Sequence, residues 1–139
     1  MNMLTIPWTA APWTSANNQS QTATLVQISR LELARTRDVP GFLIAALRIR
    51  RAALRTPGAG GLSLRAQPLR RTFWTLSTWH DEAAIGEFIG SAGHRAVMVK
   101  YRDHMASSHF HTWSTADEST NRPSWVDAHR RYETTQEQP

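Results

Sequence analysis

Four segments of the chain are predicted to be β-strands. In each of them hydrophobic residues alternate with a period of two, or apolar and β-branched residues are dense. The first spans Thr22–Leu33, where Val26 and Ile28 lie on one face and the other face carries Leu25, Leu31 and Leu33. Both faces of this strand are therefore expected to be partly covered. The same reasoning predicts three further strands at 62–66, 71–78 and 106–115.

Two of these strands carry most of the central aromatic residues. In the third strand one face is predicted to hold Trp74, Leu76 and Thr78, and the other holds Phe73, Thr75, Ser77 and Trp79. In the last strand one face holds His109, His111 and Trp113, and the other holds Phe110 and Thr112. Because successive side chains point to opposite faces, aromatic residues are expected on both sides of the sheet.

A three- and four-residue period after the first strand predicts an amphipathic helix. Asp38 and Pro40 stand where such a helix starts, as a cap-like acid and a first-turn proline. The expected buried stripe consists of Phe42, Leu43, Ala46, Leu47, Ile49, Ala53 and Leu54. The glycine- and proline-rich run 56–61 ends the helix.

A second helical region is predicted to be split in two. Asp81 is a suitable N-cap for a short helix whose buried stripe is Ile85, Phe88 and Ile89. Two glycines within 90–93 predict a break, after which Ser91 caps a second helix. The new stripe consists of His94, Val97, Met98, Tyr101 and Met105. The break moves His94 from the solvent side to the inward face.

The predicted order is strand, helix, strand, strand, split helix, strand, which is the ferredoxin-like β-α-β-β-α-β arrangement of α+β proteins with an antiparallel sheet. We assign residues 22–116 to this domain, 1–21 to an N-terminal arm and 117–139 to a C-terminal tail. The helices are expected on one sheet face. A second copy of the chain is the simplest cover for the other face, because an apolar sheet face is costly in water.

The arm and the tail both contain tryptophan. Trp8 and Trp13 either pack on the domain or a partner subunit, or belong to a disordered leader, and the sequence favours neither alternative. In the tail a short helical turn is expected at 124–132 with Trp125 as its anchor, followed by a frayed end at 134–139.

The composition is that of a single globular domain: 139 residues, 40% hydrophobic and 19% charged. There is no cysteine, no apolar run long enough to span a bilayer and no signal-type N-terminus, so we expect a cytoplasmic protein. The net charge of +5 comes largely from arginines, including Arg48, Arg50, Arg51 and Arg55. Their alternation with apolar residues favours a solvated helix face over specific nucleic-acid binding.

The pattern W-x-D-E-A-A-I-x-x-F followed by S-A-G-H-R-A-V-M, after an aromatic strand, resembles the dimeric α+β barrel superfamily. Within it the nearest group is that of antibiotic-biosynthesis monooxygenases, with its spheroidene-monooxygenase-like branch. The resemblance covers 22–115 in topology and 75–98 in its specific motif. It rests on Trp79, Asp81, Phe88, Ser91, His94, Arg95 and Met98.

This resemblance implies a homodimer with a pocket in each subunit between sheet and helices. Members include cofactor-independent oxygenases of aromatic polyketides, haem-binding or haem-degrading proteins, carotenoid oxidases and proteins without a known reaction. Haem-binding members resemble one another in using a helical His as axial ligand, and His94 is the position here that matches. The cofactor is therefore unknown, with haem among the alternatives.

The candidate site residues are histidines and aromatic residues. We assign catalytic roles to His94 and Trp79, and ligand-binding roles to Trp74, Met98, Tyr101, His111 and Trp113. Each has an alternative structural role: His94 could hydrogen-bond a sheet carbonyl, and any single aromatic residue could be plain core. His109 and His111 could join a third histidine around a metal, but a half-exposed strand face explains them better, so no metal site is predicted.

Two functions follow as hypotheses. The first is a monooxygenase-like protein with an apolar, aromatic-lined pocket, acting on a hydrophobic secondary metabolite with or without haem. The second is a non-catalytic small-molecule-binding or dimerisation module. No nucleophile elbow, phosphate-binding loop, paired-carboxylate site or dinucleotide fingerprint supports a hydrolase, a kinase or a nicotinamide-dependent dehydrogenase.

Overall fold

The computed structural model describes residues 3–11, 25–115 and 123–137. In this part of the chain five antiparallel strands form one sheet in the order β1-β3-β4-β2-β5. The strands are β1 (Leu4–Ala10), β2 (Leu25–Leu33), β3 (Ala59–Gln67), β4 (Thr72–Trp79) and β5 (Met105–Ser114). The helices are α2 (Val39–Arg55), α3 (Glu82–Ile89), α4 (Ala92–Tyr101) and α5 (Trp125–Glu137), with short 3-10 turns at Thr36–Asp38, Pro68–Arg70 and Arg102–His104.

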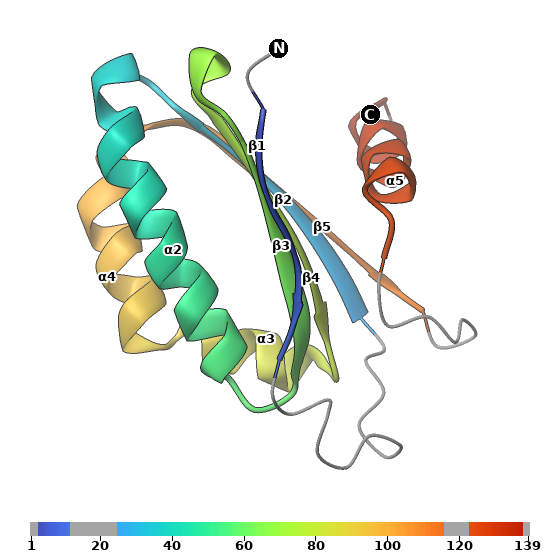
Figure 1. The fold of residues 1–139 in the computed structure, drawn as a ribbon. Helices are drawn as coiled ribbons and strands as arrows, with labels where there is room; N and C mark the ends of the chain where they lie inside the picture. The colour runs from blue at the N-terminus through green and yellow to red at the C-terminus, as the bar shows by residue number, and fades with distance from the viewer. Residues whose placement is uncertain (1–2, 12–24, 116–122, 138–139) are drawn as a thin grey trace.

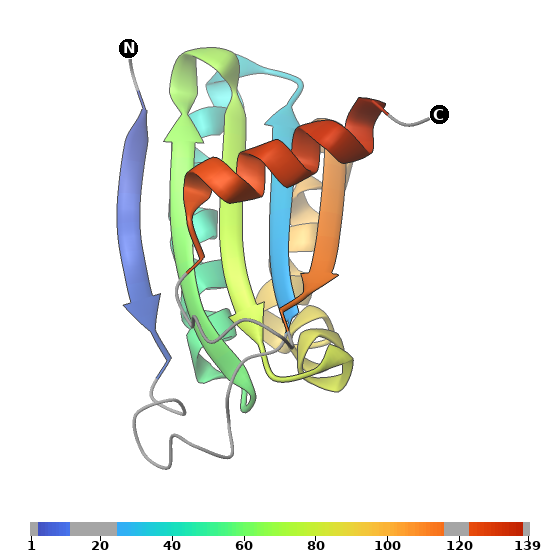
Figure 2. The ribbon, with the colours of Figure 1, turned by 90° about the vertical axis from the view of Figure 1, so that its right-hand side faces the viewer.

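The predicted ferredoxin-like α+β order is confirmed for β2, α2, β3, β4, the α3–α4 pair and β5. Helices α2, α3 and α4 lie on one face of the sheet (Figure 1). Helix α5 lies on the other face and crosses the strands obliquely (Figure 2). The structure therefore has three layers, where the sequence led us to expect two layers and a partner subunit.

Strand β1 adds a fifth strand to the predicted four. It pairs with β3 at the sheet edge, and its paired residues include Leu4 opposite Ala66 and Ile6 opposite Leu64. Trp8 packs so closely on Gly61 that a side chain there would overlap its ring. The arm thus packs on the domain through Trp8, whereas Trp13 lies outside the described residues.

Helix α5 buries the apolar centre of the outer sheet face. The buried cluster there consists of Val26, Ile28, Leu76, Ala128 and Tyr132. The chain itself therefore supplies a cover for which we expected a second copy. The helix also extends to Glu137, so the prediction of a frayed segment from Thr134 is wrong for 134–137.

Aromatic and cationic side chains fix α5 on the sheet. Trp125 donates a hydrogen bond from Nε1 to Oγ of Ser63 at 3.1 Å. The Arg65 guanidinium lies over the Trp125 ring, 4.5 Å from its centroid, and Arg131 lies 4.9 Å from the centroid of Trp113. Such cation–π contacts gain strength when they are shielded from water.

On the opposite face, the predicted stripe of α2 packs on the sheet and on α4. Phe42 makes edge-on contacts with Phe73 at 4.7 Å and with Tyr101 at 5.0 Å between ring centroids. These three rings connect α2, β4 and α4 in one core. Edge-to-face packing of this kind is favourable beyond the area that it buries.

The predicted helix break is confirmed, together with both caps. Asp81 accepts a hydrogen bond from the Ala84 amide at 2.9 Å, and Ser91 Oγ accepts one from the His94 amide at 3.4 Å. Three details of the predicted stripes are wrong. Leu47, expected in the buried stripe of α2, is 51% exposed. Ile89 is 49% exposed because it ends α3, and Met105 begins β5 because α4 already ends at Tyr101.

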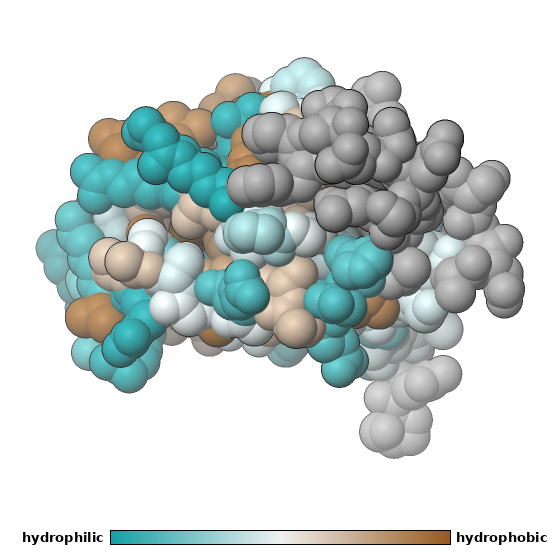
Figure 3. Space-filling view, turned by 90° about the horizontal axis from the view of Figure 1, so that it is seen from below, coloured by the Kyte–Doolittle hydropathy of each residue, from teal (hydrophilic) through white to brown (hydrophobic). Residues whose placement is uncertain are grey.

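The described helices include none that is both long enough and apolar enough to cross a membrane. Figure 3 shows the lower end of the molecule, where the strongly hydrophobic surface outside the grey atoms occurs only in small, separate areas. Surfaces of this kind are ordinary for a globular domain. The hydrophobic side chains of the fold are gathered mainly in the two sheet-covering cores.

Substitution Gly61→Ala tests the docking of β1. An ideal Cβ at this position would lie 2.4 Å from an atom of the Trp8 ring, so the ring and β1 must shift. We expect a loss of about 1–3 kcal/mol in the free energy of unfolding, measured by urea denaturation.

Gly86→Ala is the matched control, because Gly86 lies within α3 and a Cβ added there would have no neighbouring atom within 4 Å. This change should raise the free energy of unfolding by roughly 0.5–1 kcal/mol. Equal effects of the two substitutions would contradict the packing of Trp8 on Gly61.

Candidate functional site

An apolar cavity of about 250 Å³ lies between α2 and the sheet; we call it the α2 cavity. Its exposed rim comes from Leu4 and Thr5 of β1 and Ile44 and Leu47 of α2, so it opens between these two elements. The rest of its lining consists of Ile6, Leu31, Phe42, Leu43, Ala46, Ile49, Leu64, Arg65, Ala66, Phe73, Trp74 and Thr75.

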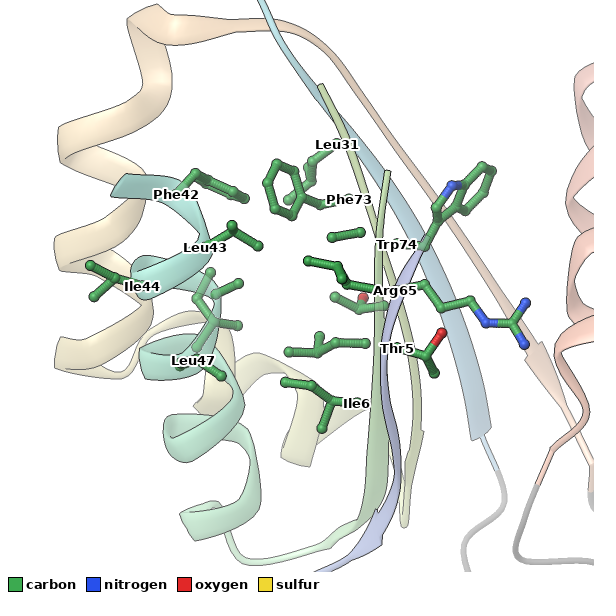
Figure 4. A pocket seen from close by; sticks show the side chains of 16 residues that line it. Thr5, Ile6, Leu31, Phe42, Leu43, Ile44, Leu47, Arg65, Phe73 and Trp74 are labelled. Carbon is green, nitrogen blue, oxygen red and sulfur yellow. The ribbon is translucent and has the colours of Figure 1, made fainter. Parts of the chain in front are cut away.

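Apolar side chains converge on this space from both walls (Figure 4). Phe42 and Leu43 point from α2 toward the sheet, and Phe73 and Leu31 point from the sheet toward α2. The side chains of Trp74 and Arg65 point to the opposite face, so these two residues line the cavity through their backbone. The interior therefore presents carbon surface almost alone.

Small residues explain why a cavity remains at this place. Ala46 on α2 and Ala66 on β3 both line it. Neither side chain is large enough to fill the space between helix and sheet, whereas the bulky Phe42 and Phe73 make contact elsewhere in the same layer. Interiors usually pack without voids of this size.

A second, open groove of about 520 Å³ lies between α4 and β5; we call it the His94 groove. It is lined by Leu31, Ile89, His94, Arg95, Met98, Val99, Arg102, Met105, Ser108 and Phe110. Phe110, Val99 and Ile89 are exposed there, so the groove has an apolar surface that is open to solvent. Leu31 also lines the α2 cavity, so the two hollows share this residue.

His94 is half-buried in the wall of this groove. Its ring meets Phe88 edge-on at 4.8 Å, and Phe88 in turn stacks on Trp79 at 5.3 Å. Its Nδ1 is buried and has no hydrogen-bond partner among the described residues. Burial lowers the pKa of the His94 imidazole, and the backbone of Ile89 partly opposes this shift. A neutral imidazole is therefore the favoured form at neutral pH.

The sheet divides the seven predicted site residues into two groups. His94 and Met98 line the His94 groove, while Trp79 and Tyr101 are buried in the core on the same side of the sheet. The remaining three lie on the α5 face: Trp74, His111 and Trp113. One hollow within one chain therefore does not bring all seven together.

The predicted residues on the α5 face have contacts of their own. Trp74 packs edge-on against Tyr132 at 5.2 Å, and His111 stacks on Trp113 at 5.5 Å. The Thr135 hydroxyl lies 3.4 Å from the ring nitrogens of His111. Trp79 is likewise engaged, because its Nε1 donates to Ser77 Oγ at 2.8 Å. Each of the four side chains, Trp74, Trp79, His111 and Trp113, therefore has packing or hydrogen-bond contacts within the fold.

Sequence reasoning did not identify the α2 cavity. Its apolar wall on α2 was found as a periodic stripe, but a stripe that packs and a stripe that leaves a cavity have the same period. The only available signal was the alanine at position 46 within that stripe, facing a strand that also carries alanine.

The histidines do not assemble into a metal centre in the described part of the chain, where no three His, Asp or Glu side chains lie close enough to share an ion. His109 and His111 belong to the α5 face, and His94 to the opposite one. His104 pairs with Asp38, with 3.1 Å between Nδ1 and Oδ2.

Comparison with solved structures identifies the class of fold: the chain has a ferredoxin-like α+β fold that is also found in proteins described as putative antibiotic biosynthesis monooxygenases. A putative antibiotic biosynthesis monooxygenase from Nitrosomonas europaea superimposes with a TM-score of 0.62 and 14% sequence identity, over 71% of this chain and 96% of that one. The protein Rv0793 from Mycobacterium tuberculosis gives a TM-score of 0.62 and 11% identity, over 70% and 100% of the two chains.

A putative monooxygenase from Lactobacillus acidophilus has a TM-score of 0.59 and 10% identity, over 66% of this chain. The match spans 44% of the length of that protein. No family model and no curated protein matches the sequence. At these identities the comparisons show the fold alone.

Two half-buried histidines, His94 and His129, predict how stability depends on pH. Burial lowers the pKa of both His94 and His129 below the ordinary value of 6.5, and the charge of Arg65 adds to the lowering at His129. The unfolded chain therefore binds protons more readily, so the free energy of unfolding should be constant above pH 7 and fall as the pH drops below about 6.5.

Urea denaturation at pH 7.5 and pH 5.5 measures this loss. His94→Gln should remove part of it and leave the stability at pH 7.5 closer to that at pH 5.5. Arg37→Gln, an exposed change on a turn, is the control and should leave the pH dependence unaltered. Identical profiles for the wild type and His94→Gln would show that His94 does not titrate below its ordinary value.

Proposed function

We propose that this protein binds a hydrophobic small molecule in the α2 cavity. The observation that supports this proposal is a cavity of about 250 Å³ with an almost wholly apolar lining and a rim on the surface. Desolvating such a lining with an apolar ligand is favourable, and a monooxygenase-like fold with an apolar pocket agrees with it.

The cavity volume sets the size of the ligand. An engineered apolar cavity of roughly 150 Å³ accommodates benzene, which corresponds to about 25 Å³ for each carbon atom. On this scale the α2 cavity accommodates roughly ten carbon atoms, about the size of a bicyclic aromatic system. A larger ligand would have to extend through the rim between α2 and β1.

The cavity itself offers little for acid–base catalysis. Thr75 is the one hydroxyl-bearing residue of its inner wall, and its Oγ1 is already hydrogen-bonded to Ser29. The α2 cavity is accordingly proposed as a binding site. Of the two functions expected from the sequence, this is the non-catalytic one, a small-molecule-binding module. The formation of a homodimer is a separate prediction.

A second candidate function is a monooxygenase-like reaction in the His94 groove, favoured by the unpartnered Nδ1 of His94. The neutral imidazole would accept the proton of a phenolic substrate, which leaves the substrate as an electron-rich anion that reacts with oxygen. Arg95 and Arg102 line the same groove, and their positive charges would stabilise that anion.

The side chains that line this groove are also of the types that bind haem: an imidazole, methionine side chains and two guanidinium groups. His94 would hold the iron, and Arg95 and Arg102 would pair with the propionates. When bound, haem would supply an iron that activates oxygen. His94 would then serve as a ligand and no longer as a base.

Filling the α2 cavity tests the principal proposal. Ala46→Leu places three additional carbon atoms in the space and should weaken the binding of 2-naphthamide, a neutral bicyclic probe, at least about tenfold by isothermal titration calorimetry. Ala96→Leu is the control, because Ala96 is exposed on α4. If the wild-type protein bound neither this probe nor 2-naphthoate, the proposed function would be wrong.

The His94 groove is tested by spectroscopy and oxygen uptake. If the groove binds haem, titration with haemin should give a Soret band that His94→Ala shifts or abolishes. If it acts without haem, oxygen uptake with 2-naphthol should fall at least about a hundredfold in the His94→Ala variant. His80→Ala changes an exposed histidine on a bend and should behave as the wild type. No band and no uptake in the wild type would exclude this second function for these two probes.

A further inference from the structure

The lower end of the α2 cavity lies beside a half-buried arginine. Ala46 and Leu47 line the cavity, and Arg50 follows one helical turn later on the same side of α2. Across the gap Ile6 lines the cavity and Thr9 lies further along β1. Arg50 Nη2 donates a hydrogen bond to Thr9 Oγ1 at 2.8 Å. This bridge from α2 to β1 therefore lies next to the cavity.

The guanidinium of Arg50 has no carboxylate partner in the described part of the chain. Its hydrogen bond to Thr9 is to a neutral hydroxyl, and its Nε is buried without any hydrogen-bond partner there. A buried donor without an acceptor is unfavourable, and a partly buried cation without an anion more so. An anion that paired with the guanidinium would remove the cost of the unpaired cation.

The Nε of Arg65 is also buried without a hydrogen-bond partner among the described residues, but its guanidinium lies over the Trp125 ring on the α5 face, away from the cavity (Figure 4). Several other arginines are paired or exposed. Arg30 and Arg71 both pair with Glu32, and Arg131 pairs with Asp127 at 2.8 Å. The neighbours of Arg50 on α2 are exposed, so water solvates their charges: Arg48, Arg51 and Arg55. Among the arginines on the cavity side of the sheet, Arg50 thus combines partial burial with the lack of an anionic partner in the described part of the chain.

We propose that the natural ligand of the α2 cavity is an apolar carboxylic acid whose carboxylate pairs with Arg50. This inference rests on the proposed function, because it takes the cavity as the binding site. The apolar lining accommodates a body of roughly ten carbon atoms, and the guanidinium supplies the charge-assisted hydrogen bond for the head group. Thr9 holds the guanidinium in place through Nη2.

Two probes of the same shape distinguish the contribution of the apolar body to the binding affinity from the contribution of the negative charge. 2-Naphthoate carries the carboxylate, and 2-naphthamide replaces it with a neutral amide. Isothermal titration calorimetry with the full chain should show that 2-naphthoate binds at least about tenfold more tightly. The preference should decrease as the salt concentration rises from about 50 to about 500 mM.

Arg50→Gln should abolish this preference: the affinity for 2-naphthoate falls at least about tenfold, and the affinity for 2-naphthamide stays the same. Arg50→Lys should retain part of it, because lysine keeps the charge and loses the planar donor set. Arg51→Gln is the matched control, since it removes an exposed charge from the adjacent position and should leave both affinities unchanged.

The two levels of the proposal fail in different ways. Absence of binding of both probes to the wild type overturns the proposed function and the ligand class with it. Equal affinity for both probes in the wild type overturns the ligand class alone. Equal weakening of both probes by Arg50→Gln assigns Arg50 a structural role in holding β1, and this also overturns the carboxylate proposal.

Discussion

The structure depends on one constraint: its sheet carries apolar side chains on both faces, and each face requires a cover. In β4 the alternation places Phe73 and Trp79 toward α2, α3 and α4, and Leu76 toward α5. Burial of apolar area is the main source of stability, so neither face can remain in water. Helix α5 covers the outer sheet face within one chain, so that face does not require a partner subunit as its cover. The three-layer architecture follows from this constraint.

The α2 cavity arises from the same arrangement. Helix α2 must cover a sheet that β1 has widened by one strand, and small residues line the cavity from both sides, Ala46 from the helix and Ala66 from the sheet. The gap is closed at one end by aromatic contacts of Phe42 and is spanned at the other by the hydrogen bond between Arg50 and Thr9. Strand β1 thus contributes to the wall of the cavity and, through Thr9, to the position of Arg50.

Much of the fold could be predicted from local patterns. The periods of two and 3.6, the caps Asp81 and Ser91 and the glycine break are local, and the structure confirms them. The pairing of β1 with β3 and the packing of α5 are contacts between distant segments with weak local signals, since β1 contains Pro7 and an irregular register. The candidate site was less predictable, because whether Ala46 packs or leaves a space depends on the residue across the gap.

The separation of the two hollows limits the chemistry that the protein can perform. The His94 imidazole, whose Nδ1 has no hydrogen-bond partner among the described residues, lies in the open groove. The apolar cavity is a different hollow, and Leu31, which is only 7% exposed, lines both. His94 is therefore absent from the lining of the α2 cavity, so a ligand there would not contact this histidine. For such a ligand to be oxidised in the cavity, its own reactivity must suffice, since the described wall supplies no free base. The binding proposed for the α2 cavity and the proton transfer proposed for the His94 groove therefore belong to two different sites, which share Leu31 in their linings.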